Sequence, residues 1–209
     1  FSTVGDYEDA VAAWDHELGV LLEALGEGPL LVLVVSDHGE SFGDHGVRRH
    51  GTGLWASQTH IPWVIWGSGL SGVVEHPVSL ADVAPTLLEL VGLPSLGRTD
   101  GLHALRRGGP VYSSLLRYTW KPDQPTAVSI VDGGLHRIER EDGLRVGYDT
   151  ARDVCEATSV PSRDLEGLLH QWRLASVKKA EQFVEAHGPV GAAVRSDDLE
   201  RLRALGYIE

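Results

Sequence analysis

Two adjacent residues in the N-terminal third of the chain have side chains that suit a metal ion. A continuous apolar run from Leu30 to Val35 and one serine, Ser36, precede Asp37 and His38, and Gly39 follows them. A carboxylate and an imidazole can both bind a divalent cation. A glycine next to them allows a sharp turn, so both side chains could face the same crevice. A loop in which Asp37 only caps the following turn is the alternative that these three residues leave open.

Further histidines follow in a glycine-rich segment. His45 and His50 each precede a glycine within the stretch from residue 40 to 53, which we expect to lack regular structure. Long connections of this kind are often functional. The ordinary pKa of a histidine, about 6.5, suits proton transfer near neutral pH. The opposing interpretation is that these histidines are solvated or shape the turns.

The elements around these residues predict an α/β fold. The run from Leu30 to Val35 has no polar alternation, which is typical of a central strand of a parallel sheet with both faces buried. Side chains at the carboxyl end of such a strand lie in a ligand-binding crevice. Apolar spacing predicts a helix from Asp6 to Leu25 before this strand, and a second strand from Ile61 to Gly67 after it.

A second helix is expected to begin at Ser79, where Asp82 completes a capping-box variant, so Asp82 has a structural role. After about residue 100 the pattern changes to short strands separated by glycine turns, followed by helices from residue 162 to 186 and from residue 197 to 205. We therefore expect an α/β part over residues 1–105 and a small antiparallel sheet with its own helix over residues 106–209.

The composition of the chain limits the kinds of partner that it could bind. The net charge of −12 argues against nucleic acid and anionic membranes. No apolar run is long enough to be a transmembrane helix. The only cysteine is Cys155, so no disulfide can form within the 209 residues. Because the sequence starts at Phe1 and contains no methionine, we expect it to be a piece of a longer product.

The ordered set of motifs resembles the sulfatase family of the alkaline-phosphatase-like superfamily. The segments that carry the resemblance are Ser36-Asp37-His38-Gly39-Glu40, Phe42-Gly43-Asp44-His45-Gly46, His50-Gly51, Ile61-Pro62, residues 77–88, Asp100-Gly101-Leu102, Gly147-Tyr148-Asp149 with Asp153 and Glu156, and the ending at residues 202–207. The implied fold is part of an alkaline-phosphatase-like sheet sandwiched by helices, followed by the small antiparallel sheet and helix.

The resemblance also implies roles. Asp37 and His38 match metal ligands of the family. The family's usual ion is Ca²⁺, and the imidazole leaves Mn²⁺, Mg²⁺ or Zn²⁺ possible. His50 matches the region that contacts the sulfate or its leaving group, and His45 is a weaker catalytic candidate. The implied substrate is a small-molecule or glycan sulfate ester, and family habit favours a periplasmic or secreted location.

Part of the family pattern is missing. Sulfatases carry a Cys/Ser-x-Pro/Ala-x-Arg motif, whose first residue becomes the formylglycine nucleophile, and an Asp pair that completes the metal site. The chain has neither, and Cys155 lacks the arginine. The resemblance therefore implies the C-terminal half of a sulfatase, inactive without the N-terminal half. The alternatives are a phosphoric or phosphonic ester hydrolase or phosphotransferase of the superfamily, and a non-catalytic remnant or interaction module.

Overall fold

The computed structural model describes residues 3–67, 69, 71–97, 99–116 and 123–187. By their internal contacts the residues form two compact units, Phe1–Leu169 and His170–Glu209. The boundary expected after residue 105 remains a prediction. The helix expected at residues 197–205 lies outside the described residues.

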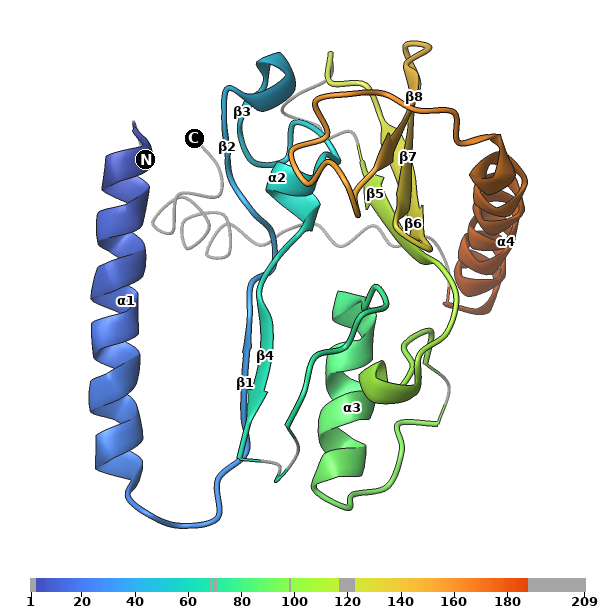
Figure 1. Cartoon of the computed structure of the whole chain (residues 1–209). Coiled ribbons are helices and arrows are strands. Elements are labelled where there is room, and N and C mark those ends of the chain that lie inside the picture. Colours follow the sequence, from blue (N-terminus) through green and yellow to red (C-terminus); the bar gives the residue numbers. More distant parts are fainter. Residues whose placement is uncertain (1–2, 68, 70, 98, 117–122, 188–209) are drawn as a thin grey trace, which may run out of the picture. The chain divides into compact units, whose positions relative to one another are not determined.

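Helix α1 spans Val4–Leu25 and confirms the first predicted helix (Figure 1). The hydroxyl of Thr3 accepts a hydrogen bond from the backbone of Asp6, whose carboxylate accepts one from the backbone of Thr3. This reciprocal pair satisfies backbone groups that a helix start leaves without partners. Gly26, with φ of 72°, ends the helix. None of the described helices is both long and apolar enough to cross a membrane.

Strands β1 (Val32–Val35) and β4 (Trp63–Trp66) pair antiparallel, with Val35 opposite Trp63 (Figure 1). The predicted positions of both strands are therefore confirmed, but β1 has no parallel neighbour among the described strands. All four β1 residues are also only half-buried. The apolar run indicated burial of both faces, and it carries no information on the direction of the neighbouring strand. The expectation of a parallel partner was therefore wrong for the described residues.

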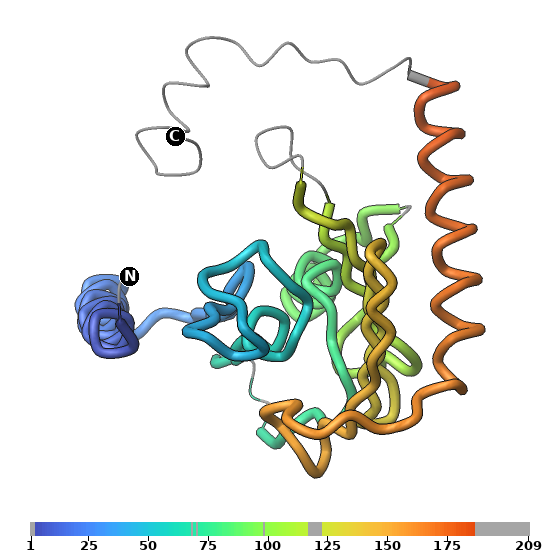
Figure 2. Tube along the Cα trace, turned by 90° about the horizontal axis from the view of Figure 1, so that it is seen from above, coloured from blue at the N-terminus to red at the C-terminus, as the bar shows by residue number. Residues whose placement is uncertain are grey.

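The connection between β1 and β4 has more structure than the sequence predicted. It contains the two-residue strands β2 (Ser41–Phe42) and β3 (Arg48–Arg49), which pair antiparallel, the 3₁₀ turn η1 (Asp44–Gly46) and the short helix α2 (Ala56–Thr59). Figure 2 shows this segment as a compact loop in light blue to cyan. His45 therefore lies in the turn of a hydrogen-bonded hairpin, and His50 directly follows its second strand.

The second predicted helix consists of the 3₁₀ turn η2 (Leu80–Asp82) and helix α3 (Val83–Leu90), capped by Ser79 as expected. Asp82 is fully buried and also accepts a hydrogen bond from Arg107 at 2.6 Å. Its predicted structural role is confirmed. A further 3₁₀ turn, η3, spans Ala104–Arg106.

The antiparallel sheet is confirmed and forms a simple meander in the order β5-β6-β7-β8. The strands span Val111–Leu115, Ala127–Asp132, Leu135–Arg140 and Arg145–Asp149. The expected glycine turns join β6 to β7 and β7 to β8. Helix α4 spans Arg163–His187, and its first turns bury Leu165 and Leu169.

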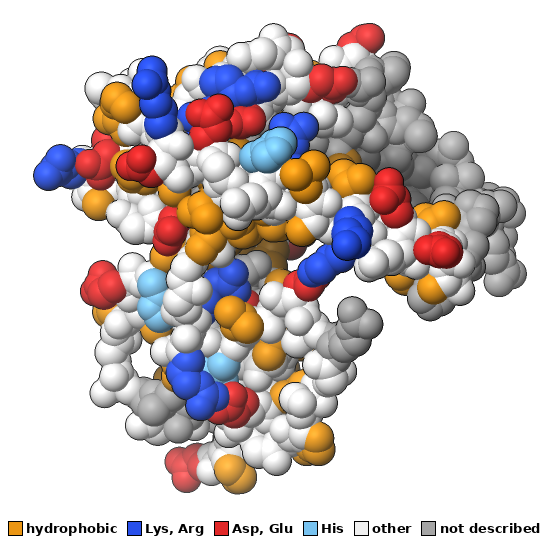
Figure 3. All heavy atoms as spheres, turned by 90° about the vertical axis from the view of Figure 1, so that its right-hand side faces the viewer, with side chains coloured by type: hydrophobic (Ala, Val, Ile, Leu, Met, Phe, Trp, Pro, Cys, Tyr) orange, Lys and Arg blue, Asp and Glu red, His pale blue; other side chains and the backbone are white. Residues whose placement is uncertain are grey.

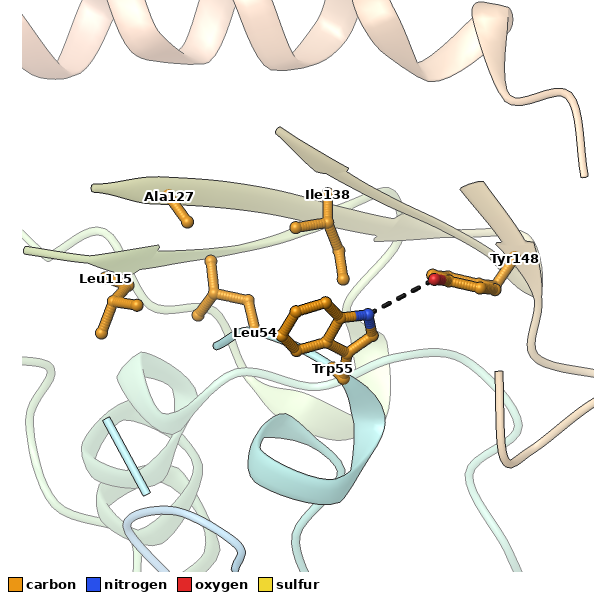
Figure 4. Packing of buried hydrophobic residues seen from close by; sticks show 6 residues of the cluster. All are labelled: Leu54, Trp55, Leu115, Ala127, Ile138 and Tyr148. Atoms are coloured by element: carbon orange, nitrogen blue, oxygen red, sulfur yellow. Dashed lines mark hydrogen bonds between the residues drawn. The ribbon is translucent and has the colours of Figure 1, made fainter. Parts of the chain in front are cut away.

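The main hydrophobic cluster joins this sheet to the segment before α2. It consists of Leu54, Trp55, Leu115, Ala127, Ile138 and Tyr148, and the indole N–H of Trp55 donates to the Tyr148 hydroxyl at 3.3 Å (Figure 4). The sheet and the segment that leads from the histidine hairpin into α2 therefore share one core. On the face shown in Figure 3, acidic and basic side chains are interspersed, with exposed hydrophobic side chains between them.

Candidate functional site

The end of β1 presents two ligand-type atoms toward each other. The carboxylate oxygen Oδ2 of Asp37 lies 3.6 Å from Nε2 of His38. Two ligand atoms about 2.1 Å from a shared ion lie about 3–3.5 Å apart, so this spacing is close to what one cation would need. The Asp37 side chain is 74% exposed and that of His38 is 40% exposed. Both are accessible to an ion from solvent.

A local hydrogen bond favours one tautomer of His38. Its Nδ1 lies 2.9 Å from the carbonyl oxygen of Gly39. A carbonyl oxygen only accepts, so Nδ1 carries the hydrogen, and Nε2 of the neutral ring has a free lone pair. Asp37 is held as well, because its Oδ1 accepts from the backbone N–H of His38 at 3.0 Å. The donor set of one carboxylate oxygen and one imidazole nitrogen fits a divalent cation.

Gly39 is required here for a reason that differs from the sequence expectation. Its φ is not in the left-handed region, so it does not supply a special turn. Instead, a Cβ at this position would lie 2.2 Å from the carbonyl oxygen of Ser57 in α2. The backbone N–H of Gly39 donates to the carbonyl of Gln58 at 2.9 Å. Glycine therefore allows the end of β1 to lie directly against α2.

His50 lies beside the Asp37–His38 pair. The rings of His50 and His38 are stacked, with centres 4.1 Å apart and planes 27° apart. Nδ1 of His50 lies 3.0 Å from Oε2 of Glu40. A carboxylate accepts the Nδ1 hydrogen, which leaves Nε2 of His50 for proton exchange with a ligand.

Glu40 is a residue of the candidate site to which the sequence reasoning assigned no role. Its side chain is only 12% exposed, and its second oxygen, Oε1, is buried without a hydrogen-bond partner within the described part of the chain. A half-paired buried carboxylate is costly unless another group completes it. The signal available in the sequence was the acidic residue three positions after Asp37, but its distance of ten residues from His50 concealed the contact.

His45 lies in a different environment. Its backbone φ is 52°, and its ring stacks on Trp55 with centres 4.9 Å apart. It lines a cavity of about 210 Å³. The cavity is lined by Asp44, His45, Ala56, Ser57, His60, Val154 and Cys155. The structure thus brings His50, but not His45, against His38.

Within the ranges given above, no three or more His, Cys, Asp or Glu side chains form a cluster that could hold a metal ion. Cys155 is exposed and lines the same cavity as His45.

Comparison with known proteins identifies the family. A family model described as Sulfatase matches residues 2–93. A "Sulfatase" of Formosa agariphila is 31% identical over 72% of this chain and 31% of its own length. "Arylsulfatase K" of Danio rerio is 37% identical over 47% of this chain and 20% of its own. A 2,3-bisphosphoglycerate-independent phosphoglycerate mutase of Desulforudis audaxviator is 40% identical over 46% of this chain and 19% of its own. The chain thus spans about a third or less of these relatives.

Solved structures agree on the fold. A putative sulfatase of Bacteroides thetaiotaomicron has a TM-score of 0.62 at 16% identity and covers 88% of this chain and 44% of its own. A protein in complex with its substrate D-glucosamine-2-N,6-O-disulfate has a TM-score of 0.57 at 19% identity. The match covers 87% of this chain and 41% of that protein. The phosphonate monoester hydrolase of Agrobacterium radiobacter has a TM-score of 0.59 at 24% identity. The match covers 82% of this chain and 40% of the hydrolase. These structures show that the fold is alkaline-phosphatase-like α/β. The family model over residues 2–93, together with the 31% identity to the Formosa agariphila protein, shows that this part of the chain belongs to the sulfatase family.

Proposed function

We propose that this chain supplies the metal-binding and leaving-group side of a sulfatase-type active site that hydrolyses sulfuric esters. The single observation that carries the proposal is the Asp37–His38 ligand pair with the His50 ring stacked against it. Family membership supports it independently. The substrate class we propose is a small-molecule or glycan sulfate ester, as in the related structure that binds a disulfated glucosamine.

Each residue has a defined task in this proposal. Oδ2 of Asp37 and Nε2 of His38 would hold a divalent cation, Ca²⁺ as the first choice and Mn²⁺, Mg²⁺ or Zn²⁺ as the others. When bound there, the cation would neutralise negative charge on the sulfate oxygens. Nε2 of His50 would donate a proton to the departing alkoxide oxygen. Glu40 holds the hydrogen of His50 on Nδ1 and so fixes the orientation of the ring.

The proposal needs groups beyond these 209 residues. The nucleophile would be a formylglycine formed in the N-terminal half of the longer protein, together with the Asp pair that completes the metal site. We therefore propose that the isolated chain does not turn over sulfate esters, because it lacks an activated nucleophile. The location we propose is periplasmic or secreted, supported by the family resemblance alone.

A phosphoric or phosphonic ester hydrolase, or a phosphotransferase, is the second candidate. It is favoured by the 40% identity to a phosphoglycerate mutase and by the fold shared with a phosphonate monoester hydrolase. Steady-state rates of the full-length protein on matched 4-nitrophenyl sulfate, phosphate and phenylphosphonate esters separate the two. A sulfatase has the highest kcat/KM on the sulfate. A preference for either phosphorus ester would overturn the proposed function in favour of the second candidate.

A further inference from the structure

A buried carboxylate joins the antiparallel sheet to α2. Glu156 is 1% exposed, and its Oε2 accepts a hydrogen bond from the backbone N–H of Ala56 at 2.8 Å, across 100 residues of sequence. Its Oε1 accepts from Nδ1 of His136 on β7, which is also 1% exposed. Both carboxylate oxygens are therefore used, one on each side of the junction.

The backbone at Glu156 is held in an uncommon conformation. Its φ is 56°, in the left-handed region, which is unfavourable for a residue other than glycine. The turn retains this conformation through two hydrogen bonds: Glu156 donates from its backbone to the Asp153 carbonyl at 3.0 Å, and Thr158 donates to the Asp153 side chain at 2.7 Å. The turn thus directs a buried carboxylate at the first residue of α2.

Helix α2 in turn forms hydrogen bonds with both ends of the β2–β3 hairpin. The Gln58 carbonyl accepts from Gly39, the residue after His38. The Gln58 side chain is buried, donates to Ser41 and Thr52 at 2.9 Å each, and accepts from the backbone N–H groups of Thr52 and Gly53. Gln58 therefore contacts the segment after His38 and the segment after His50 at the same time.

A second contact runs along the same route. Trp55, the residue before α2, donates to the Tyr148 hydroxyl on β8 and packs in the cluster that includes Ile138 (Figure 4). Two links, the Glu156 carboxylate and the Trp55 side chain with its hydrogen bond and apolar contacts, therefore connect α2 to the antiparallel sheet. Through Gln58, α2 in turn contacts the segments that follow His38 and His50.

We propose that Glu156 is a positioning residue of the candidate site, acting through α2 on the stacked pair His38 and His50. The inference rests on the proposed function for the meaning of the site, but its geometry can be tested separately. Among the described hydrogen bonds and ion pairs, none joins the antiparallel sheet to the Asp37–His38 pair. The sheet would therefore influence the geometry of the site only indirectly, through α2.

The test uses the full-length protein with ¹³C,¹⁵N-labelled histidine. In Glu156→Gln only one of the two acceptor oxygens remains. We expect the ring resonances of His38 and His50 to shift, and the dissociation constant for Mn²⁺, measured by calorimetry, to rise about 10-fold, at the lower end of the usual effect of outer partners on metal sites.

Two further variants make the result decisive. Glu139→Gln removes a carboxylate from the same strand as His136, where Glu139 pairs with Arg137 and Arg145 of the sheet. It should lower Tm without moving either histidine. Ala56→Pro removes the N–H donor and leaves Glu156 in place, at a helix position that accepts proline and after a residue with extended backbone. It should reproduce the shifts even if Glu156→Gln does not fold.

Shifts of both histidines in Glu156→Gln or Ala56→Pro, and not in Glu139→Gln, would support the inference. Unchanged histidine resonances in Ala56→Pro and in any folded Glu156→Gln protein, with only Tm lowered, would overturn it. Absence of Mn²⁺ binding by the wild-type protein would count against the proposed function, whereas the histidine resonances would still decide the positioning role.

Discussion

The imidazole rings of His38 and His50 are stacked with their centres 4.1 Å apart, although twelve positions separate them in the sequence. Nε2 of His38 faces the carboxylate of Asp37, and Nδ1 of His50 is hydrogen-bonded to the carboxylate of Glu40, which orients the His50 ring. The hairpin of β2 and β3 brings the two rings together. A ligand that reaches the Asp37–His38 pair would therefore also meet His50.

Replacement of His50 by glutamine should slow the full-length protein in a way that depends on the leaving group. A general acid typically contributes 10²–10⁴-fold, so we expect about a 100-fold loss or more on an alkyl sulfate. The loss should be much smaller on 4-nitrophenyl sulfate, whose leaving oxygen needs little protonation. The same kcat/KM series on His16→Gln, a substitution on the exposed surface of α1, provides the control. Equal losses on both ester types would contradict the acid role.

Glu40→Gln tests whether Glu40 acts through His50. Glutamine keeps the size but can turn its amide nitrogen toward Nδ1 and so release the ring from its orientation. We expect a loss of kcat/KM smaller than that of His50→Gln. In the double variant the two losses should not add, because both remove the same interaction. Full additivity in this cycle would show that Glu40 and His50 act independently.

Gly39→Ala should destabilise the protein by about 1–3 kcal/mol, the usual cost of forcing an extra carbon into a packed contact. The new Cβ would lie 2.2 Å from the Ser57 carbonyl and would push α2 away from β1. The free energy of unfolding from urea titration measures the effect. Gly28→Ala is the matched control, since no heavy atom lies within 4 Å of its added Cβ. Similar stabilities of the two variants would refute the close-approach explanation.

The turn between β7 and β8 gives a prediction on pH. Two hydrogen bonds from the Arg140 guanidinium lower the pKa of Asp142 below its ordinary value. A lowered folded-state pKa means that the contribution to stability is present above the unfolded pKa, about 3.9, and is lost as pH falls through the folded value. The Tm difference between wild type and Asp142→Asn should therefore be positive at pH 7 and shrink below about pH 4. A difference that is the same at pH 7 and pH 2 would contradict this.

Local patterns were enough to predict most elements. Apolar spacing marked the first helix, the capping pair Ser79–Asp82 marked the start of the second, and the glycine turns marked the β6–β7 and β7–β8 hairpins. Such signals are local in the chain, so sequence alone can carry them. The adjacency of Asp37 and His38 is local in the same way.

The rest depended on contacts that no local pattern encodes. The direction of β4 beside β1 is set by how the connection folds back, and the apolar run is equally compatible with both directions. The pairing of Glu40 with His50 and the contact of Glu156 with Ala56 join residues ten and 100 positions apart. Gly39 was interpreted as a turn residue because a close approach to Ser57 is visible only in three dimensions.

The most direct test of the account is the metal content and affinity of the full-length protein, measured by equilibrium dialysis and elemental analysis for the wild type, Asp37→Ala and His38→Ala. We predict that the wild type retains a stoichiometric divalent ion. Each variant should bind it at least about 100-fold more weakly, since even outer partners of metal ligands contribute 10–100-fold. Sulfate-ester hydrolysis should fall in step with metal content. Full metal occupancy and activity in either variant would contradict the central claim.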